Sequence, residues 1–185
     1  MGWLGLAVLV GAMGWLAQFP VPPPVIAFLL AATVLGLLKM SPGAAETLRA
    51  GGVGRLIAFH KIRIVVGAYF LLLFNQGVLP REFAVPAGFG DIVVGVAAMS
   101  VLSRHVPIQD DAQRKAVLMW NTVGLLDIVL VLLNGVRLFL RDPALGAAFT
   151  ELPLALLPLF VVPIVIATHL LLFSWVGVAD SGRGS

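Results

Sequence analysis

Apolar runs recur along this chain of 185 residues at close to the length that crosses a lipid bilayer, roughly 17 to 25 residues. Hydrophobic residues make up 60% of the sequence and charged residues only 11%, whereas a soluble domain carries about 25% charged residues. Because so few charges cannot cover a surface that faces water, we predict an all-α, polytopic membrane protein, a bundle of six transmembrane helices in a single domain of residues 1–179. The predicted spans are residues 3–19, 25–39, 57–79, 86–103, 115–138 and 152–178, and a short polar tail follows at 180–185.

The basic residues lie mostly between the apolar runs and predict an orientation. A pI near 10 would also suit a nucleic-acid-binding protein, but an excess of Lys and Arg in cytoplasmic loops explains this distribution better. With six spans, nine basic residues fall on one side of the membrane and three on the other. The nine are Lys39, Arg49, Arg55, Lys61, Arg63, Arg104, Arg114, Lys115 and Arg183, and the three are Arg81, Arg137 and Arg141. We therefore predict cytoplasmic N- and C-termini, the lipid bilayer as the main partner and no nucleic acid.

The fifth predicted span, residues 115–138, carries an aspartate in its middle. Burial of Asp127 at that depth costs roughly 2.5 to 3.5 kcal/mol, while each surrounding Leu, Ile or Val returns only about 0.3 to 0.6 kcal/mol. Spacings of three and four residues place it on one helical face with Trp120, Gly124 and Asn134. Since lipid cannot hydrogen-bond these side chains, this face is predicted to point into the bundle. The alternative is a protonated carboxyl that only holds a neighbouring helix.

Other polar side chains are expected at staggered depths, from Asp91 near the outer end of the fourth span to His60 at the inner end of the third. Asp and His in such a ladder are residue types that relay protons or hold a cation, although Asp91 could instead stabilise a helix N-terminus. Arg137 is ten residues from Asp127, about 15 Å, so contacts to Asp127 are expected from His169 and from third-span amides. The predicted path residues are Asp127, Asp91, His169, Asn134, Trp120, Asn121 and Asn75.

These residues favour a small transporter or channel-like protein for a proton, a cation or a small solute, and they leave alternatives open. His60 and His169 are expected in the same half of the membrane, which permits a redox protein that binds haem or a divalent metal. A metal site would use Asp127 and His169. The scarcity of extramembrane sequence suits a non-catalytic subunit of a larger membrane complex, and the Gly-rich first span suits a homodimer. The sequence has no cysteine, no phosphate-binding glycine loop and no HExxH motif, so it gives no support for an enzyme.

Two stretches of the chain resemble each other. Residues 88–93 and 124–129 match at Gly, Asp, Ile and Val. Because adjacent spans run in opposite directions, the match could be the trace of an inverted repeat of the transporter kind, with chance similarity in an apolar, Gly-rich chain as the alternative. Pro86 and the charged residues around it, in 81–91, also predict a partly re-entrant start to the fourth span.

Three pieces of the second half of the chain resemble a known group of proteins. They are Phe83-Ala84-x-Pro86-Ala87-Gly88-x-Gly90-Asp91, Trp120-Asn121-x-x-Gly124-Leu125-x-Asp127, and Leu157-Pro158 with Pro163 and His169. They look like those of a group of small, uncharacterised bacterial multi-span proteins. The resemblance implies a six-helix protein of a bacterial inner membrane, and it brings no activity, substrate or cofactor with it.

Overall fold

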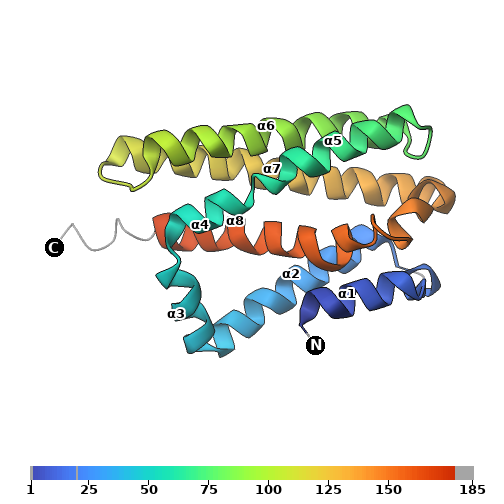
Figure 1. Ribbon diagram of the computed structural model, residues 1–185, viewed down its shortest axis with the longest axis horizontal. Helices are drawn as coiled ribbons and strands as arrows, with labels where there is room; N and C mark the ends of the chain where they lie inside the picture. Colours follow the sequence, from blue (N-terminus) through green and yellow to red (C-terminus); the bar gives the residue numbers. More distant parts are fainter. Residues whose placement is uncertain (1, 20, 178–185) are drawn as a thin grey trace.

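The computed structural model describes residues 2–19 and 21–177, and within them every regular element is a helix. The longer helices run side by side along the long axis of the molecule (Figure 1). The elements in chain order are α1 (Trp3–Ala12), the 3-10 helix η1 (Trp15–Gln18), α2 (Pro23–Met40), α3 (Pro42–Ala50), α4 (Gly52–Phe59), α5 (Ile62–Asn75), α6 (Arg81–His105), α7 (Asp111–Arg141), the 3-10 helix η2 (Pro143–Thr150), the π-helical turn η3 (Leu157–Val161) and α8 (Val162–Gly177). The predicted all-α architecture is confirmed. The predicted polar tail, residues 180–185, lies outside the described residues.

Five helical segments are long and apolar enough to cross a membrane, as expected for a multi-span protein. They are Pro23–Met40, Gly52–Asn75, Arg81–His105, Asp111–Arg141 and Leu157–Gly177. The span expected over residues 3–19 is instead the ten-residue α1, about 15 Å long where the hydrocarbon core is about 30 Å thick. It ends before Gly14, whose φ of 65° no regular right-handed helix contains. The predicted number of six spans is therefore not confirmed.

The segment between α2 and α5 contains more helix than the sequence suggested. The predicted spans 25–39 and 57–79 left residues 41–54 between them without a helix, but α3 and the start of α4 occupy these residues. The third predicted span, residues 57–79, is divided at His60 and Lys61, where α4 ends and α5 begins. The consequence is that α4 occupies the end of the bundle, and the first turn of α5 lies deeper inside.

The predicted re-entrant start to the fourth span is wrong, because α6 runs unbroken from Arg81 through Pro86. A proline in a helix has no N–H to donate to the carbonyl four residues earlier, which here is that of Glu82. The side-chain Nδ2 of Asn134 donates to this carbonyl over 2.8 Å. A neighbouring helix thus supplies the hydrogen bond that Pro86 cannot, one of the ways in which membrane helices tolerate proline.

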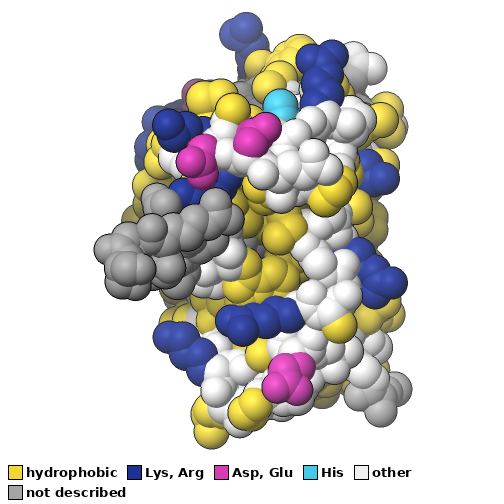
Figure 2. Space-filling view, turned by 90° about the vertical axis from the view of Figure 1, so that its left-hand side faces the viewer, with side chains coloured by type: hydrophobic (Ala, Val, Ile, Leu, Met, Phe, Trp, Pro, Cys, Tyr) yellow, Lys and Arg dark blue, Asp and Glu magenta, His cyan; other side chains and the backbone are white. Residues whose placement is uncertain are grey.

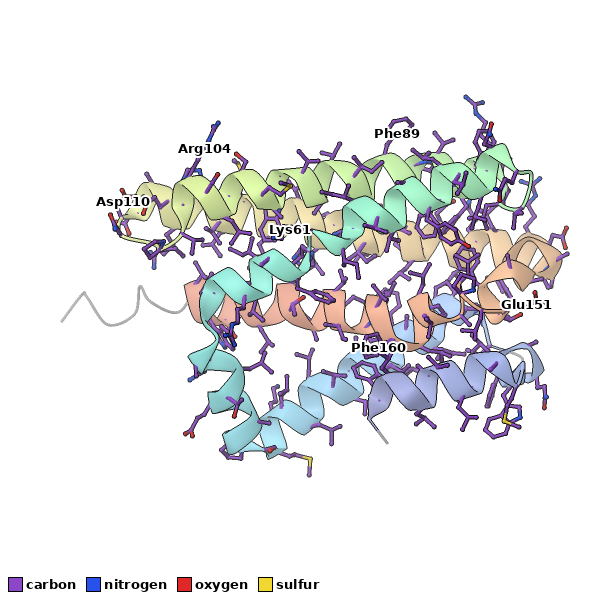
Figure 3. The ribbon with its side chains drawn as sticks, viewed as in Figure 1. Lys61, Phe89, Arg104, Asp110, Glu151 and Phe160 are labelled. Carbon is purple, nitrogen blue, oxygen red and sulfur yellow. The ribbon has the colours of Figure 1, made fainter. Side chains whose placement is uncertain are left out.

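Basic residues mark the two ends of the bundle unequally. Three of them, Arg81, Arg137 and Arg141, lie at what we call the opposite end. Six lie at the other end, which we call the basic end: Lys39, Arg49, Arg55, Arg104, Arg114 and Lys115. The sequence had also assigned Lys61 and Arg63 to that end, and this was wrong, since Figure 3 shows Lys61 part-way along the bundle, away from Arg104. Arg183 lies outside the described residues. The remaining excess is six to three.

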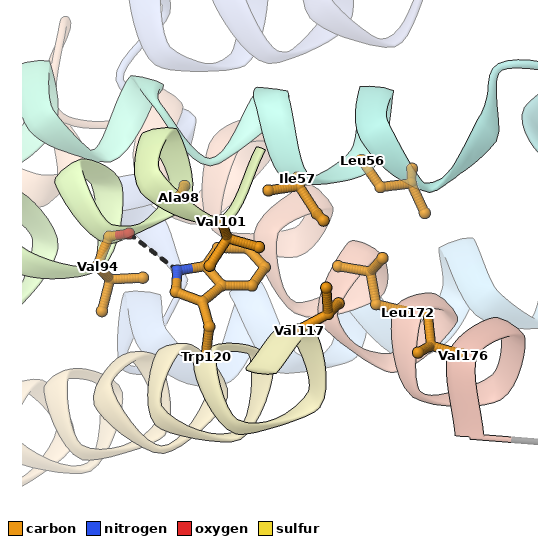
Figure 4. Close-up of a cluster of buried hydrophobic side chains, with 9 residues drawn as sticks. All are labelled: Leu56, Ile57, Val94, Ala98, Val101, Val117, Trp120, Leu172 and Val176. Carbon is orange, nitrogen blue, oxygen red and sulfur yellow. Dashed lines mark hydrogen bonds between the residues drawn. The ribbon is translucent and has the colours of Figure 1, made fainter. Parts of the chain in front are cut away.

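Apolar side chains fill the two ends of the bundle and leave a polar layer between them. Near the basic end, α4, α6, α7 and α8 pack around Trp120 (Figure 4). At the opposite end Phe70, Phe83 and Phe149 pack edge to face, with ring centres 4.9 to 6.3 Å apart. The candidate site lies between these two clusters.

Candidate functional site: a buried ion cluster

The centre of the polar layer is Arg63, in the first turn of α5, whose side chain is only 2% exposed. Its Nε donates to Oδ1 of Asp91 over 2.6 Å. Its Nη2 donates to Oδ2 of Asp127, in a short ion pair. Its Nη1 donates to the carbonyl oxygen of Gly124 over 3.1 Å. One guanidinium thus holds two carboxylates, from α6 and α7, and a backbone oxygen inside the bundle.

Arg63 corrects the sequence prediction for Asp127. We expected Arg63 at the membrane interface, no basic residue of its own helix near Asp127, and contacts to Asp127 from His169 and third-span amides. The prediction was wrong because α4 occupies the basic end of the bundle, so Arg63 lies eleven residues beyond Gly52, where α4 begins. A buried guanidinium with a rigid fork of donors is well suited to hold two carboxylates at once. The expected third-span amide, Asn75, is exposed at the far end of α5 and takes no part in the cluster.

Two glycines allow the helices to approach closely enough for these contacts. A Cβ atom at Gly90 of α6 would lie 2.9 Å from Cγ of Asp127, and one at Gly124 of α7 would lie 2.5 Å from Cε1 of His169. Carbon atoms do not approach that closely in ordinary contacts. The small residues therefore place the carboxylate against α6 and the imidazole against α7.

His169 of α8 adjoins the cluster on its basic side and is fully buried. Asn121 holds it at two points, since Nδ2 donates to the His169 carbonyl over 3.0 Å and Oδ1 lies 2.8 Å from Nδ1 of the ring. An amide oxygen only accepts, so Nδ1 carries the hydrogen and the neutral ring has a lone pair on Nε2. That atom faces Nη1 of Arg63 at 3.5 Å. Asn121 thus sets the tautomer that turns a lone pair toward the guanidinium.

A second buried histidine continues the polar layer. The ring of His60 lies 4.1 Å from the ring of His169, centre to centre. The Thr168 hydroxyl donates its one hydrogen to a backbone carbonyl of α8. Its oxygen therefore accepts a hydrogen bond from Nε2 of His60 over 3.1 Å. Nδ1 of His60 then has a lone pair with no hydrogen-bond partner among the residues that the structure describes. Trp120 packs edge-on against His60, with ring centres 5.2 Å apart.

This geometry bears on the haem and metal alternatives. Axial histidines hold a haem from opposite faces of its ring, but the rings of His60 and His169 are in direct contact, with no room for a porphyrin between them. Within residues 2–19 and 21–177, no three His, Asp or Glu side chains converge as metal ligands. The carboxylates are instead bound to Arg63, which occupies the place of a cation. As folded, the site favours an ion-pair cluster over a cofactor clamp.

Comparison with known proteins places the chain in a family. A family model described as a domain of unknown function (DUF8737) matches residues 20–176, more than four-fifths of the chain. The chain belongs to the DUF8737 family. No curated protein and no solved structure matches it.

All the residues of the ion cluster and the histidine pair lie inside the DUF8737 match, whereas α1 and η1 lie outside it. Of the predicted path residues, the structure brings Asp127, Asp91, His169 and Asn121 together around Arg63. Trp120 borders them, and its Nε1 donates to the carbonyl of Val94 over 3.1 Å.

Asn134 does not join the cluster. It serves the carbonyl of Glu82 near the opposite end, although it shares a helical face with Asp127 as the sequence predicted. The residue that sequence reasoning missed is Arg63. A signal for it was present, because Arg63 follows His60, a residue already singled out, by three residues, which places both on one face of the continuous span that the sequence predicted.

The two similar stretches of the DUF8737 chain meet at this site. Each contributes its aspartate to the same guanidinium, Asp91 from α6 and Asp127 from α7. The two helices run in opposite directions (Figure 1). A shared ion partner gives a physical reason for both stretches to keep a Gly-x-x-Asp spacing, whether the match arose by duplication or by chance.

A cavity of about 70 Å³ connects this site with the opposite end of the bundle. Its lining includes Arg63 and Asp91. The rest of its wall is apolar and comes from the start of α2, from α5, α6, α7 and α8, and from η2 and η3, with Pro24, Phe83 and Phe149 among the side chains. The space suffices for a few water molecules, and the two charged side chains would give them polar partners.

Proposed function

We propose that this protein is a multi-span carrier of the bacterial inner membrane that moves a proton or a small monovalent cation through the cluster of Arg63, Asp91 and Asp127. The proposal depends on one observation, that two carboxylates share one guanidinium inside the bundle. With one positive and two negative groups, the ionised cluster has a net charge of −1. Because uncompensated charge is costly inside a membrane protein, the cluster attracts one further positive charge.

The surroundings of the two carboxylates support access to them. The side chain of Asp91 is only 4% exposed, but it lines the cavity that extends from the site toward the opposite end of the bundle. The side chain of Asp127 is 20% exposed. We therefore propose that the proton or cation enters from the opposite end and first reaches Asp91. The two carboxylates together then bind it, and it compensates their excess negative charge. The guanidinium of Arg63 offers only hydrogen-bond donors, and it donates to both carboxylates, so its role is to anchor them.

The histidine pair supports a route toward the basic end. In the direction of that end the cluster is followed by His169 and then by His60, with the ring contact and the free lone pair described above. Neutral imidazoles accept and donate protons at different nitrogens, which is the chemistry of a relay. A proton passes from the carboxylates to His169 only if a water bridges them or a side chain turns, since Arg63 lies between them.

The charge distribution supports an orientation with the basic end in the cytoplasm. The helix α8 runs toward that end, and α1, which is too short to cross the bilayer, runs away from it (Figure 1). We therefore propose that both termini face the cytoplasmic side. The chain has no cysteine, which makes labelling tests simple. An impermeant maleimide added to intact cells is expected to label Glu151→Cys and to leave Glu46→Cys unlabelled, and the reverse pattern would contradict this orientation.

The test of transport is ion flux into liposomes that contain the purified protein. A trapped pH-sensitive dye reports proton entry under an imposed pH gradient, and dyes for Na⁺ and K⁺ report the other ions. Asp127→Asn and Asp91→Asn are expected to lower the flux at least tenfold, because each removes a negative group that binds the ion. Asp111→Asn, at an exposed site before the bilayer, is the matched control and should change the flux less than twofold.

Two results would contradict the proposal. One is a wild-type flux of all three ions no greater than that of empty liposomes. The other is an unchanged flux in Asp127→Asn and Asp91→Asn variants that elute as folded protein in size-exclusion chromatography.

A further inference from the structure

A groove opens at the basic end between α2, α3 and α8, away from the ion cluster. Its volume is about 620 Å³. Helix α3 turns across the end of the bundle and joins the end of α2 to the start of α4 (Figure 1). The groove wall is mainly apolar, and its hydrophobic side chains are Leu35, Leu38, Ala45, Leu48, Leu170, Leu171 and Trp175.

The rim of the groove is charged. Lys39 at the end of α2 and Arg49 at the end of α3 line it from two sides, and Glu46 is the one acidic residue among the lining side chains. The guanidinium carbon of Arg49 lies 5.9 Å from the ring centre of Trp175, a cation–π distance. These three charged groups sum to +1. Figure 2, which views this end, shows hydrophobic side chains in a hollow bordered by Lys and Arg side chains.

The position of the groove places its wall and its rim at different depths of a bilayer, the hydrocarbon region and the headgroup region. Leu35 and Leu38 lie in the last turns of α2, a helix long and apolar enough to cross the hydrocarbon core, and Lys39 follows them directly. Helix α3 has no buried residue, and it lies across the direction of the spans, as amphipathic helices do at a membrane surface. The apolar wall is thus at the level of acyl chains, and the basic rim is at the level of phosphates.

We propose that this groove binds one anionic phospholipid. An acyl chain packs along Leu38 and Leu171, and the phosphodiester lies between Lys39 and Arg49. Basic pockets between helices at a cytoplasmic membrane face select acidic lipid headgroups, and the long Lys and Arg side chains reach the phosphates while their stems cover apolar surface. The inference requires only that the helices cross a membrane, and it is independent of the transport proposal.

The test measures lipid binding directly. Purified protein in detergent is mixed with phosphatidylglycerol or with phosphatidylcholine of the same acyl chains, and bound lipid is counted by native mass spectrometry. Wild-type protein is expected to retain phosphatidylglycerol preferentially. The double variant Lys39→Gln, Arg49→Gln should bind it about 30-fold more weakly, because each basic group near the headgroups contributes about a factor of five.

A matched pair of substitutions separates this site from general attraction to acidic lipid. Arg104→Gln, Lys115→Gln removes two exposed charges at the same end of the bundle but outside the groove, and it should change the affinity less than twofold. The proposal is overturned if the two double variants lose affinity equally, or if wild-type protein shows no preference for phosphatidylglycerol. It is also overturned if soluble glycerol phosphate competes as well as the intact lipid, since the acyl contacts would then contribute nothing.

A second measurement needs no substitution at the basic residues. Phosphatidylglycerol with brominated acyl chains should quench the fluorescence of Trp175 in wild-type protein, and the quenching should fall in Trp175→Phe. Quenching that is the same in both proteins would place the lipid elsewhere.

Discussion

The substitution Arg63→Met tests whether the ion cluster is held together as the structure indicates. It leaves Asp91 and Asp127 beside each other inside the bundle with no cation. Two like charges at about 4 Å repel each other by about 4 kcal/mol at an effective dielectric constant of 20. Removal of one partner from a buried ion pair typically costs about 3 to 5 kcal/mol. Since Arg63 is 2% exposed and Met offers the two carboxylates neither charge nor a hydrogen-bond donor, we expect a loss of unfolding free energy of about 3 to 5 kcal/mol.

The triple variant Arg63→Met, Asp91→Asn, Asp127→Asn removes the charges together. Its two amides can hydrogen-bond each other, and replacement of a whole buried ion network by neutral groups is often neutral or stabilising. We expect it to unfold within about 2 kcal/mol of the wild type, even though transport is lost. Unfolding is followed by the fluorescence of the four tryptophans during titration of mixed micelles with a denaturing detergent. The reasoning is refuted if Arg63→Met is as stable as the exposed control Arg104→Met, or if the triple variant is as unstable as the single one.

Two further substitutions test the close packing around the cluster. Gly90→Ala puts a methyl group where the Asp127 carboxylate lies, so the carboxylate must turn away from Arg63. We expect ion flux to fall at least tenfold and the unfolding free energy to fall by about 1 to 3 kcal/mol. The control Gly36→Ala, with no neighbouring atom within 4 Å, should leave both unchanged. Trp120→Phe removes the buried bond to the Val94 carbonyl and should cost about 1 to 3 kcal/mol of unfolding free energy, measured in the same detergent titration; a variant as stable as wild type would show that this bond is dispensable.

Much of the site could be predicted from residue type and spacing. Asp127 and Trp120 were placed on an inward face because their spacing matches the helical repeat, and that face does meet α6 and α8. His169 was expected near Asp127, and the two side chains lie on either side of Arg63, which contacts both. Such predictions succeed because a polar group in an apolar segment has few places to go.

The rest could not be predicted because it depends on tertiary structure. No proline or glycine marks the break at His60 and Lys61, so the third span looked continuous. Arg63 was therefore predicted at the basic end of the bundle, although α4 occupies that position. The role of Asn134 depends on Pro86, which lies on another helix and in a part of the sequence far from it. The shortness of α1 has a local signal in Gly14, but glycine is common in membrane helices, so the residue alone did not predict a break.

The order of the charged residues along the chain has a consequence for biogenesis. During membrane insertion Arg63 on α5 reaches the translocon ahead of both aspartates, since Asp91 follows 28 residues later on α6 and Asp127 follows 64 residues later on α7. A lone arginine at mid-helix opposes partitioning into lipid. The segment from residue 52 to 141 is therefore expected to enter the lipid as one unit. Arg63 would stay in the aqueous channel of the translocon until Asp91 and Asp127 arrive to pair with it.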